Sequence, residues 1–264
     1  MFLEQPASYN GADIYKYNFI IHTKNTAACI DTEPDILSQS VKHPRVVELC
    51  EVSMNEIRLR AYAKVNLGLD VLRRREDGYH DVRMVMQNIN LFDKIFIKRR
   101  KEAGISVKSN LSYLPNDKGN LAYRAAALLM DEFNVKNGVE IELYKFIPVA
   151  AGMAGGSADA AAVLYGINKL FRLGLDLAGL MERGVSLGAD IPYCLMGGTV
   201  LAEGIGEKLT RLKDCPDCYF VVAKPPFSVS TKLVYEKLVL DERTEHPDID
   251  GIMAAIDADD VQGI

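Results

Sequence analysis

Alternating apolar and polar residues predict a β-strand over residues 56–72. In its second half, apolar side chains occupy every second position: Val65, Leu67, Leu69 and Val71. Successive side chains of a strand point to opposite faces, so Lys64 and Asn66 share the polar face. Similar patterns predict further strands at 82–89, 94–98, 105–108 and 139–143, and buried strands at 197–202 and 219–223.

Helical spacing of apolar residues predicts a helix from Leu121 to Phe133, after Asn120 as its cap. Another helix follows a glycine-rich segment, and Asp159 is expected in its first turn, where a carboxylate interacts favourably with the helix dipole. Strands and helices mix without regular βαβ alternation, so the pattern predicts an α+β fold. Further helices are predicted at 176–186, beyond Thr231 and at 249–257.

Residues 1–53 show no sustained period of either kind, and regular patterning begins just after Met54. Either Met54 is the native start and an extension precedes it, or residues 1–53 form a small accessory element. Residues 44–52 suit a short helix or a strand.

Composition narrows the class of protein. The 264 residues are 48% apolar and 25% charged, which is typical of a soluble globular protein. A net charge of −5 argues against nucleic acid or an anionic membrane as the main partner. No apolar run could span a bilayer and no secretory signal is visible, so with five cysteines, an odd number, the sequence predicts a cytoplasmic protein. Cys215 and Cys218 form a lone C-x-x-C pair, and we expect no metal or redox centre there.

Residues 147–161 form a small-residue loop that runs into a helix. Its three glycines, Gly152, Gly155 and Gly156, let a ligand approach the backbone closely. The helix directs unpaired N–H groups and its positive dipole end at that ligand, which favours phosphate. The loop matches neither the Walker phosphate loop nor the dinucleotide fingerprint. A tight turn with a close-packed helix start is the structural alternative.

Three separated segments carry groups that suit phosphoryl transfer. Lys64 can supply a cation, the loop can hold phosphates, and Asp190 can orient or deprotonate an acceptor hydroxyl. Lys64 and Asp190 could also pair, which would keep Asp190 ionised. The alternatives are a solvated lysine and a helix-capping aspartate, since Pro192 suits the first position of a helix.

The sequence resembles the 4-diphosphocytidyl-2-C-methyl-D-erythritol kinases, a family within the GHMP kinase superfamily. The glycine loop points only to the superfamily, whereas the Asp77-Gly78-Tyr79-His80 element points to this family. The resemblance covers about residues 55–240, with motifs in matching order: 61–67, 74–80, 120–125, the loop, 187–192, 202–207 and 224–231.

The resemblance implies an enzyme that uses ATP and Mg²⁺ to phosphorylate the 2-hydroxyl of a cytidine-diphosphate substrate, in the non-mevalonate route to isoprenoids. It implies that Lys64 and Asp190 form the catalytic pair, and that Ser157 lies near a magnesium ion held through the phosphates. The expected ATP-binding residues are Pro148, Ala150, Gly152, Met153, Ala154, Gly155, Gly156 and Ser157. The expected substrate contacts are Asn66, Tyr79, His80, Lys145 and Tyr235, with the two tyrosines stacking on the cytosine.

The resemblance also implies two domains after an extension at 1–53: an N-terminal ATP-binding domain like domain 2 of ribosomal protein S5 at 54–201, and a ferredoxin-like C-terminal domain at 202–264. Members normally continue for several tens of residues with a third glycine-rich stretch, so the second domain is expected to be incomplete. Met153-Ala154 replaces the leucine-glycine often found in the family, and the alanine is expected to fit if its φ stays negative.

Two other functions remain open on the sequence alone. One is a sister GHMP kinase acting on a non-nucleotide alcohol, and the other is a truncated, non-catalytic nucleotide-binding protein. Binding of cytidine nucleotides separates the first of these from the favoured function. The expected partner is a small-molecule substrate, with no nucleic acid or membrane, and the expected state is a monomer or homodimer.

Overall fold

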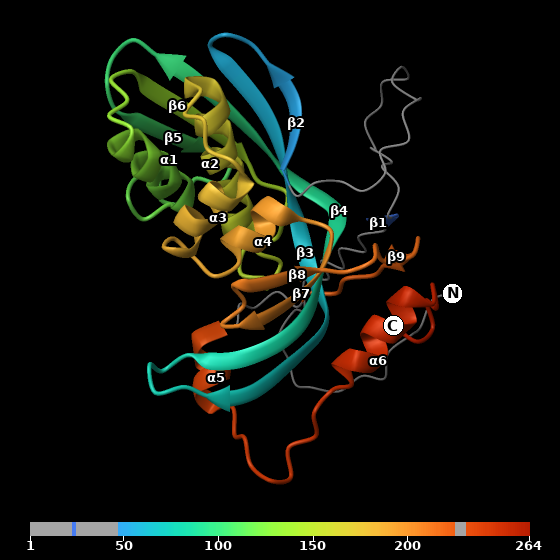
Figure 1. The fold of residues 1–264 in the computed structure, drawn as a ribbon. Coiled ribbons are helices and arrows are strands. Elements are labelled where there is room, and N and C mark those ends of the chain that lie inside the picture. The colour runs from blue at the N-terminus through green and yellow to red at the C-terminus, as the bar shows by residue number, and fades with distance from the viewer. Residues whose placement is uncertain (1–22, 25–46, 225–230) are drawn as a thin grey trace, which may run out of the picture.

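A long antiparallel hairpin runs through most of the molecule (Figure 1). It consists of β3 (Glu56–Arg74) and β4 (His80–Arg100). The strand predicted over 56–72 is therefore confirmed. The computed structural model describes residues 23–24, 47–224 and 231–264.

β4 is longer than the sequence pattern indicates. Two separate strands are predicted at 82–89 and 94–98, but β4 continues through the residues between them. β3 pairs with β4 on both sides of this stretch, and the register shifts between Tyr62 and Lys64. The interrupted apolar pattern therefore marks a shift in pairing and not the end of a strand.

The other edge of β4 carries two strands in succession. β6 (Gly138–Tyr144) pairs with residues 94–100, and β7 (Thr199–Gly204) pairs with residues 82–87. Residues 88–93 lie between these two partners. We call this stretch the sheet gap, and the candidate site forms around it.

Three further strands complete the seven-stranded sheet. β2 (Val47–Val52) pairs antiparallel with β3, and β5 (Ile105–Ser109) pairs parallel with β6. β8 (Lys208–Arg211) pairs with β7. Of the two alternatives for residues 44–52, the structure shows a strand over 47–52.

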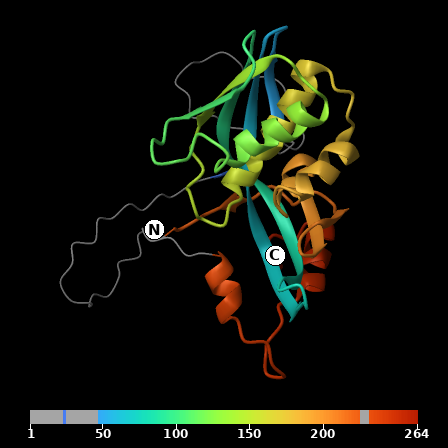
Figure 2. The ribbon, with the colours of Figure 1, turned by 90° about the vertical axis from the view of Figure 1, so that its left-hand side faces the viewer.

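Helices α1 (Leu121–Glu132) and α2 (Gly155–Phe171) cover one face of the sheet (Figures 1 and 2). The predicted cap of α1 is confirmed, because the Asn120 side chain accepts a hydrogen bond from a backbone N–H of the first turn at 2.9 Å. α2 packs closely on the hairpin: a Cβ atom added to Gly166 would lie 2.5 Å from Cδ1 of Ile97. The buried apolar side chains between helices and sheet form the main core.

Two short helices, α3 (Leu177–Val185) and α4 (Ile191–Met196), lead from α2 to β7. The predicted domain boundary at residue 202 falls inside β7, which belongs to the same sheet as β4. The division into domains at 54–201 and 202–264 stays a prediction.

The last predicted helices are present as α5 (Thr231–Lys237) and α6 (Ile249–Asp257), on either side of the hairpin (Figures 1 and 2). No helix in the described part of the chain is long and apolar enough to cross a membrane.

The prediction of a buried strand over 219–223 is wrong. β9 covers only Tyr219–Phe220 and pairs with β1 (Thr23–Lys24) outside the main sheet. Tyr219 is 60% exposed. Phe220 and Val222 are only partly buried, against a cluster that includes Ala63 of β3 and Ile89 of β4.

Candidate active site

The predicted phosphate loop lies at the N-terminal end of α2. The helix begins at Gly155, and in the described part of the chain no side chain caps its first turn. Gly152 and Gly156 are exposed, and a Cβ atom added to Gly152 would meet no atom within 4 Å. The uncapped N–H groups and the positive end of the helix dipole therefore border open space, an arrangement that binds anions such as phosphate.

Ala154, the N-cap of α2, has a φ of +57°, so the condition under which alanine was expected to fit is not met. Ala150 shares this left-handed conformation, with a φ of +54°. The conformation brings Cβ close to the following carbonyl oxygen and costs a residue other than glycine about 1–2 kcal/mol. The loop therefore stores strain next to the open anion site.

Met153 anchors the loop to the sheet. Its buried side chain packs against Ala63, Ile89 and Ile147. Its carbonyl oxygen accepts a hydrogen bond from the backbone N–H of Lys64 at 3.2 Å. The loop and the strand that carries the predicted catalytic lysine are thus joined through their backbones.

The two predicted catalytic residues have different surroundings. Lys64 is only 5% exposed, and its Nζ donates to Oδ1 of Asn66 at 2.9 Å. Asp190 occupies the N-cap position of α4, with Pro192 in the first turn, but its side chain makes no capping hydrogen bond. Within the described residues no salt bridge joins Lys64 to Asp190, so the direct pair that their charges allow is not formed. The Asp190 carboxylate is not used in capping the helix.

The charges of Lys64 and Asp190 both act on the side chain of Cys194. This side chain is fully buried, one turn after Asp190. Burial raises the pKa of the Cys194 thiol well above its usual value, the charge of Asp190 raises it further, and the charge of Lys64 lowers it. Burial followed by the charge of Asp190 also raises the pKa of Tyr235. Because such effects weaken with distance, Lys64 and Asp190 both lie near Cys194, and Asp190 also lies near Tyr235.

Lys145 lies in a buried ion triad. Its Nζ pairs with the carboxylates of Asp93 and Asp159, the latter at 2.5 Å, and also donates to the carbonyl oxygen of Gly155 at 3.3 Å. Burial raises the pKa of Asp159 well above its usual value, although Lys145 lowers it. The expectation that Asp159 lies in the first turn of its helix is wrong, since α2 begins at Gly155 and has no acidic residue there. Contact of Lys145 with nucleotide or substrate stays a prediction, because its partners here are protein groups.

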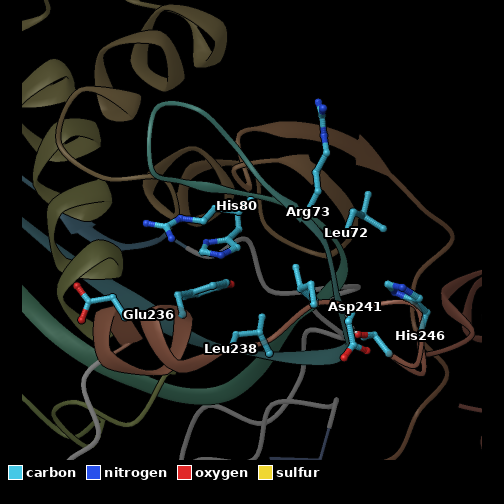
Figure 3. Close-up of a pocket in the computed structure, with 11 residues that line it drawn as sticks. Leu72, Arg73, His80, Glu236, Leu238, Asp241 and His246 are labelled. Carbon is cyan, nitrogen blue, oxygen red and sulfur yellow. Dashed lines mark hydrogen bonds between the residues drawn. The ribbon is translucent and has the colours of Figure 1, made fainter.

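A cavity of about 450 Å³ lies between the turn end of the hairpin and α5 (Figure 3). Its volume falls in the range of about 300–1,000 Å³ that is usual for small-molecule sites. His80 and Arg73 line it from the hairpin, and Tyr235 and Glu236 line it from α5. The rings of His80 and Tyr235 face each other with centroids 5.0 Å apart and planes 33° apart. The structure thus brings together two of the residues expected to bind the base.

Tyr79 lies outside this cavity. It is 61% exposed in the turn between β3 and β4, and its backbone N–H donates to Oδ1 of Asp77 at 3.1 Å. The structure therefore pairs Tyr235 with His80 and leaves Tyr79 at the surface. A contact between Tyr79 and the base stays a prediction.

Sequence reasoning missed Asp93, which sits at one end of the sheet gap. Its Oδ1 accepts hydrogen bonds from the backbone N–H groups of Phe146 (2.5 Å) and Ile147 (2.9 Å), just past the end of β6. The carboxylate thus replaces sheet hydrogen bonds where the chain leaves β6 for the predicted phosphate loop. The signal in the sequence was a carboxylate within a largely apolar segment. In the structure Asp93 is fully buried.

Comparisons with known proteins bear on the family of this chain. The family model for the GHMP kinases N terminal domain matches residues 120–198. The 4-diphosphocytidyl-2-C-methyl-D-erythritol kinase of Lachnospira eligens is 58% identical over 208 residues, which cover 79% of this chain and 72% of the relative. The enzyme of the same name from Lachnoclostridium phytofermentans is 56% identical over 208 residues with the same coverage.

Solved structures give the same result. A crystal structure of 4-(cytidine 5'-diphospho)-2C-methyl-D-erythritol kinase superposes with a TM-score of 0.63 and 35% identity, covering 76% of this chain and 71% of that one. Homoserine kinase from Cytophaga hutchinsonii has a TM-score of 0.57 at 20% identity, covering 81% and 71%, and so shares the fold. The fold and the loop define a GHMP kinase. Within that class, the chain belongs to the 4-diphosphocytidyl-2-C-methyl-D-erythritol kinase family.

Proposed function

We propose that this chain transfers the γ-phosphoryl group of ATP to the 2-hydroxyl of 4-diphosphocytidyl-2-C-methyl-D-erythritol, a step of the non-mevalonate route to isoprenoid precursors. The observation that carries the proposal is the 58% identity over 208 residues to the Lachnospira eligens kinase. The uncapped start of α2 and the shared neighbourhood of Lys64 and Asp190 support it.

In this reaction Asp190 and Lys64 have different roles. Asp190 orients the acceptor hydroxyl and takes its proton, for which its carboxylate is available because it does not cap α4. Lys64, held by Asn66, offsets negative charge on the group in transfer. The N-terminal end of α2 holds the phosphates of ATP in reach of both residues.

The donor set at the start of α2 fits a metal–nucleotide complex. The helix start offers uncapped N–H groups, and Ser157 in its first turn is only partly buried. We place Mg²⁺ beside the Ser157 hydroxyl, held through the phosphates, where the ion neutralises phosphate charge.

The cavity beside α5 receives the cytosine. A flat base gains dispersion contact from an aromatic ring on its face, and the stacked rings of His80 and Tyr235 offer an outer face of this kind. We expect Tyr79, which precedes His80 in the exposed turn, to contact the base from the solvent side.

The test is a coupled assay of ADP release from MgATP, with and without 4-diphosphocytidyl-2-C-methyl-D-erythritol. We expect release that depends on this substrate. Asp190→Asn should lower kcat by about 10²–10⁴-fold, because the variant loses its general base.

Asp176→Asn is the matched control. Asp176 caps α3 through a hydrogen bond from Gly179 N–H at 2.8 Å, and asparagine caps helices equally well. This variant should keep wild-type turnover. Wild-type turnover in Asp190→Asn, or ADP release with homoserine but not with the cytidine substrate, would refute the proposal.

A further inference from the structure

Asn88 lies at the end of the sheet gap that borders β7. In the pairing of β3 with β4 it stands opposite Lys64, and it is 1% exposed. The register shifts beside this pair, so the regular ladder of backbone hydrogen bonds is interrupted there. Buried backbone groups outside the ladder need other partners, and the Asn88 amide offers both a donor and an acceptor.

The Asn88 amide joins two segments of the active site. Its Oδ1 accepts a hydrogen bond from the backbone N–H of Gly198 at 2.6 Å, and its Nδ2 donates to the carbonyl oxygen of Ala63 at 3.4 Å. Ala63 directly precedes Lys64. Gly198 directly follows the C-cap of α4, the helix that begins at Asp190.

Gly198 is itself fixed to α4. The hydroxyl of Tyr193 donates to the carbonyl oxygen of Gly198 at 2.9 Å, and Tyr193 is fully buried. Gly197 N–H donates to the carbonyl oxygen of Tyr193 at 2.8 Å, and Cys194 N–H donates to that of Asp190 at 2.9 Å. The short helix and Gly198 therefore form one rigid piece, and the position of Gly198 determines that of Asp190.

We propose that Asn88 is a positioning residue that sets the separation between Lys64 and Asp190. This inference rests on the proposed role of these two residues in phosphoryl transfer. Two hydrogen bonds through one amide connect the backbone next to Lys64 with the end of the helix that carries Asp190. An apolar side chain of similar volume fills the same space but makes neither bond. A misplacement of about 1 Å can lower an enzymatic rate about 10²-fold.

A neighbouring network supplies a matched control. The hydroxyl of Thr199 donates to Oε1 of Gln87 at 2.6 Å and accepts from the backbone N–H of Cys215 at 2.8 Å. Thr199 is as deeply buried as Asn88, but its side chain ties β7 to β4 and to the chain after β8. Thr199→Val therefore removes two buried hydrogen bonds from the same region and leaves the Asn88 bridge intact.

The kinetic experiment compares Asn88→Leu, Asn88→Thr and Thr199→Val with the wild type. We expect Asn88→Leu to lower kcat at least tenfold, with KM for ATP and for the cytidine substrate within twofold. Asn88→Thr, whose hydroxyl can still accept from Gly198, should recover part of this loss. Thr199→Val should lower the melting temperature but keep kcat within twofold. An Asn88→Leu variant with the kcat of Thr199→Val would overturn the proposal, as would equal losses in kcat for all three variants.

A structural measurement separates this proposal from the proposed function. Crystal structures of the wild type and Asn88→Leu should differ in the distance from Lys64 Nζ to the Asp190 carboxylate by at least about 0.5 Å, the tolerance of a productive site. If Asn88→Leu does not fold, Asn88→Ala takes its place in both experiments with the same expectation. An unchanged distance overturns the positioning role whether or not the wild type is active, whereas an inactive wild type with a changed distance refutes only the phosphoryl-transfer function.

Discussion

At the scale of single residues, the buried triad of Lys145, Asp93 and Asp159 concentrates charge beside the phosphate loop. Two carboxylates share one ammonium group, and all three side chains are buried. Asp93 accepts two further hydrogen bonds from backbone N–H groups, whereas Oδ1 of Asp159 has no hydrogen-bond partner among the described residues. Asp159 is therefore the member whose charged form is least stabilised, in line with its raised pKa.

This asymmetry predicts how Asp159→Asn changes stability with pH. The pKa of Asp159 is higher in the folded protein than in the unfolded chain, whose value is about 3.9. Above that pH the folded state holds more protons, so the contribution of Asp159 to stability is lost as pH rises towards its folded pKa. Asparagine does not titrate. The melting temperature of the variant minus that of the wild type should therefore increase by about 2 °C or more as pH rises from about 5 to 8.

The measurement is differential scanning calorimetry across this pH range. Asp176→Asn, an exposed replacement of the same kind, should show no such trend. A difference between Asp159→Asn and wild type that stays constant with pH would contradict the account of the triad.

The left-handed alanine of the loop leads to a second residue-scale prediction. At a φ of +57°, glycine avoids the contact between Cβ and carbonyl oxygen that alanine suffers, so Ala154→Gly should stabilise the fold by about 1 kcal/mol. Ala162→Gly, in the interior of the same helix, should instead destabilise by about 1 kcal/mol. Urea unfolding measures both changes in the free energy of unfolding, provided that the m-value stays the same. A loss of stability in Ala154→Gly would show that residue 154 does not keep this left-handed conformation in solution.

At the scale of elements, the packing of α6 on the hairpin combines an apolar face with ion pairs. Ile249 and Ile256 of α6 are buried in a cluster with Val85 of β4. Arg83 forms a bidentate pair with Asp250 at 2.9 and 2.6 Å, but the Asp250 side chain is largely exposed. The apolar contacts should therefore contribute most of the stabilisation.

Single substitutions can separate the two contributions. Ile256→Ala should lower the free energy of unfolding by about 2–5 kcal/mol, because it leaves a cavity in a fully buried cluster. Arg83→Ala should lower it by at most about 1 kcal/mol, since a solvent-exposed ion pair is weak. Denaturant unfolding compares the two variants, and an equal or larger loss for Arg83→Ala would assign the docking of α6 mainly to the ion pair.

At the scale of the whole molecule, the site is assembled from segments distant in sequence around the hairpin. The hairpin carries Lys64 in one half and His80 at its turn end, and α5 adds Tyr235 from the far end of the chain. The neighbouring charge of Asp190 raises the pKa of Tyr235 further, after burial, so the cavity proposed for the base lies near the proposed catalytic aspartate. Nucleotide phosphates and cytidine substrate should therefore bind at separate surfaces that meet at Asp190.

Substitutions of Tyr235 test whether ATP and the cytidine substrate bind at separate surfaces. Tyr235→Ala should raise KM for the cytidine substrate about tenfold or more, because base–aromatic stacking contributes about 1–3 kcal/mol, and should leave KM for ATP unchanged. Tyr235→Phe keeps the ring and should keep the wild-type KM. Steady-state kinetics with each substrate varied in turn measures both values, and a parallel rise in KM for ATP would contradict separate surfaces.

The sequence predicted much of the local structure. The cap at Asn120, the helices after it, the strand at 56–72 and the start of α2 at the glycine loop depend on residues close together in the chain, where periodicity and capping chemistry act. The failures are equally specific. The pattern divided β4 in two and predicted a buried strand at 219–223, because pairing with distant strands determines continuity and burial.

The sequence by itself determined the class of this protein, since the motifs that carry its resemblance to the family are short and keep their order along the chain. Only the tertiary structure decided the burial of Lys145 between two carboxylates, the pairing of Tyr235 with His80 in place of Tyr79, and the positive φ of Ala154. The physical reason is that a motif records local geometry, whereas the partner of a buried charge or ring depends on which distant segments the sheet brings together.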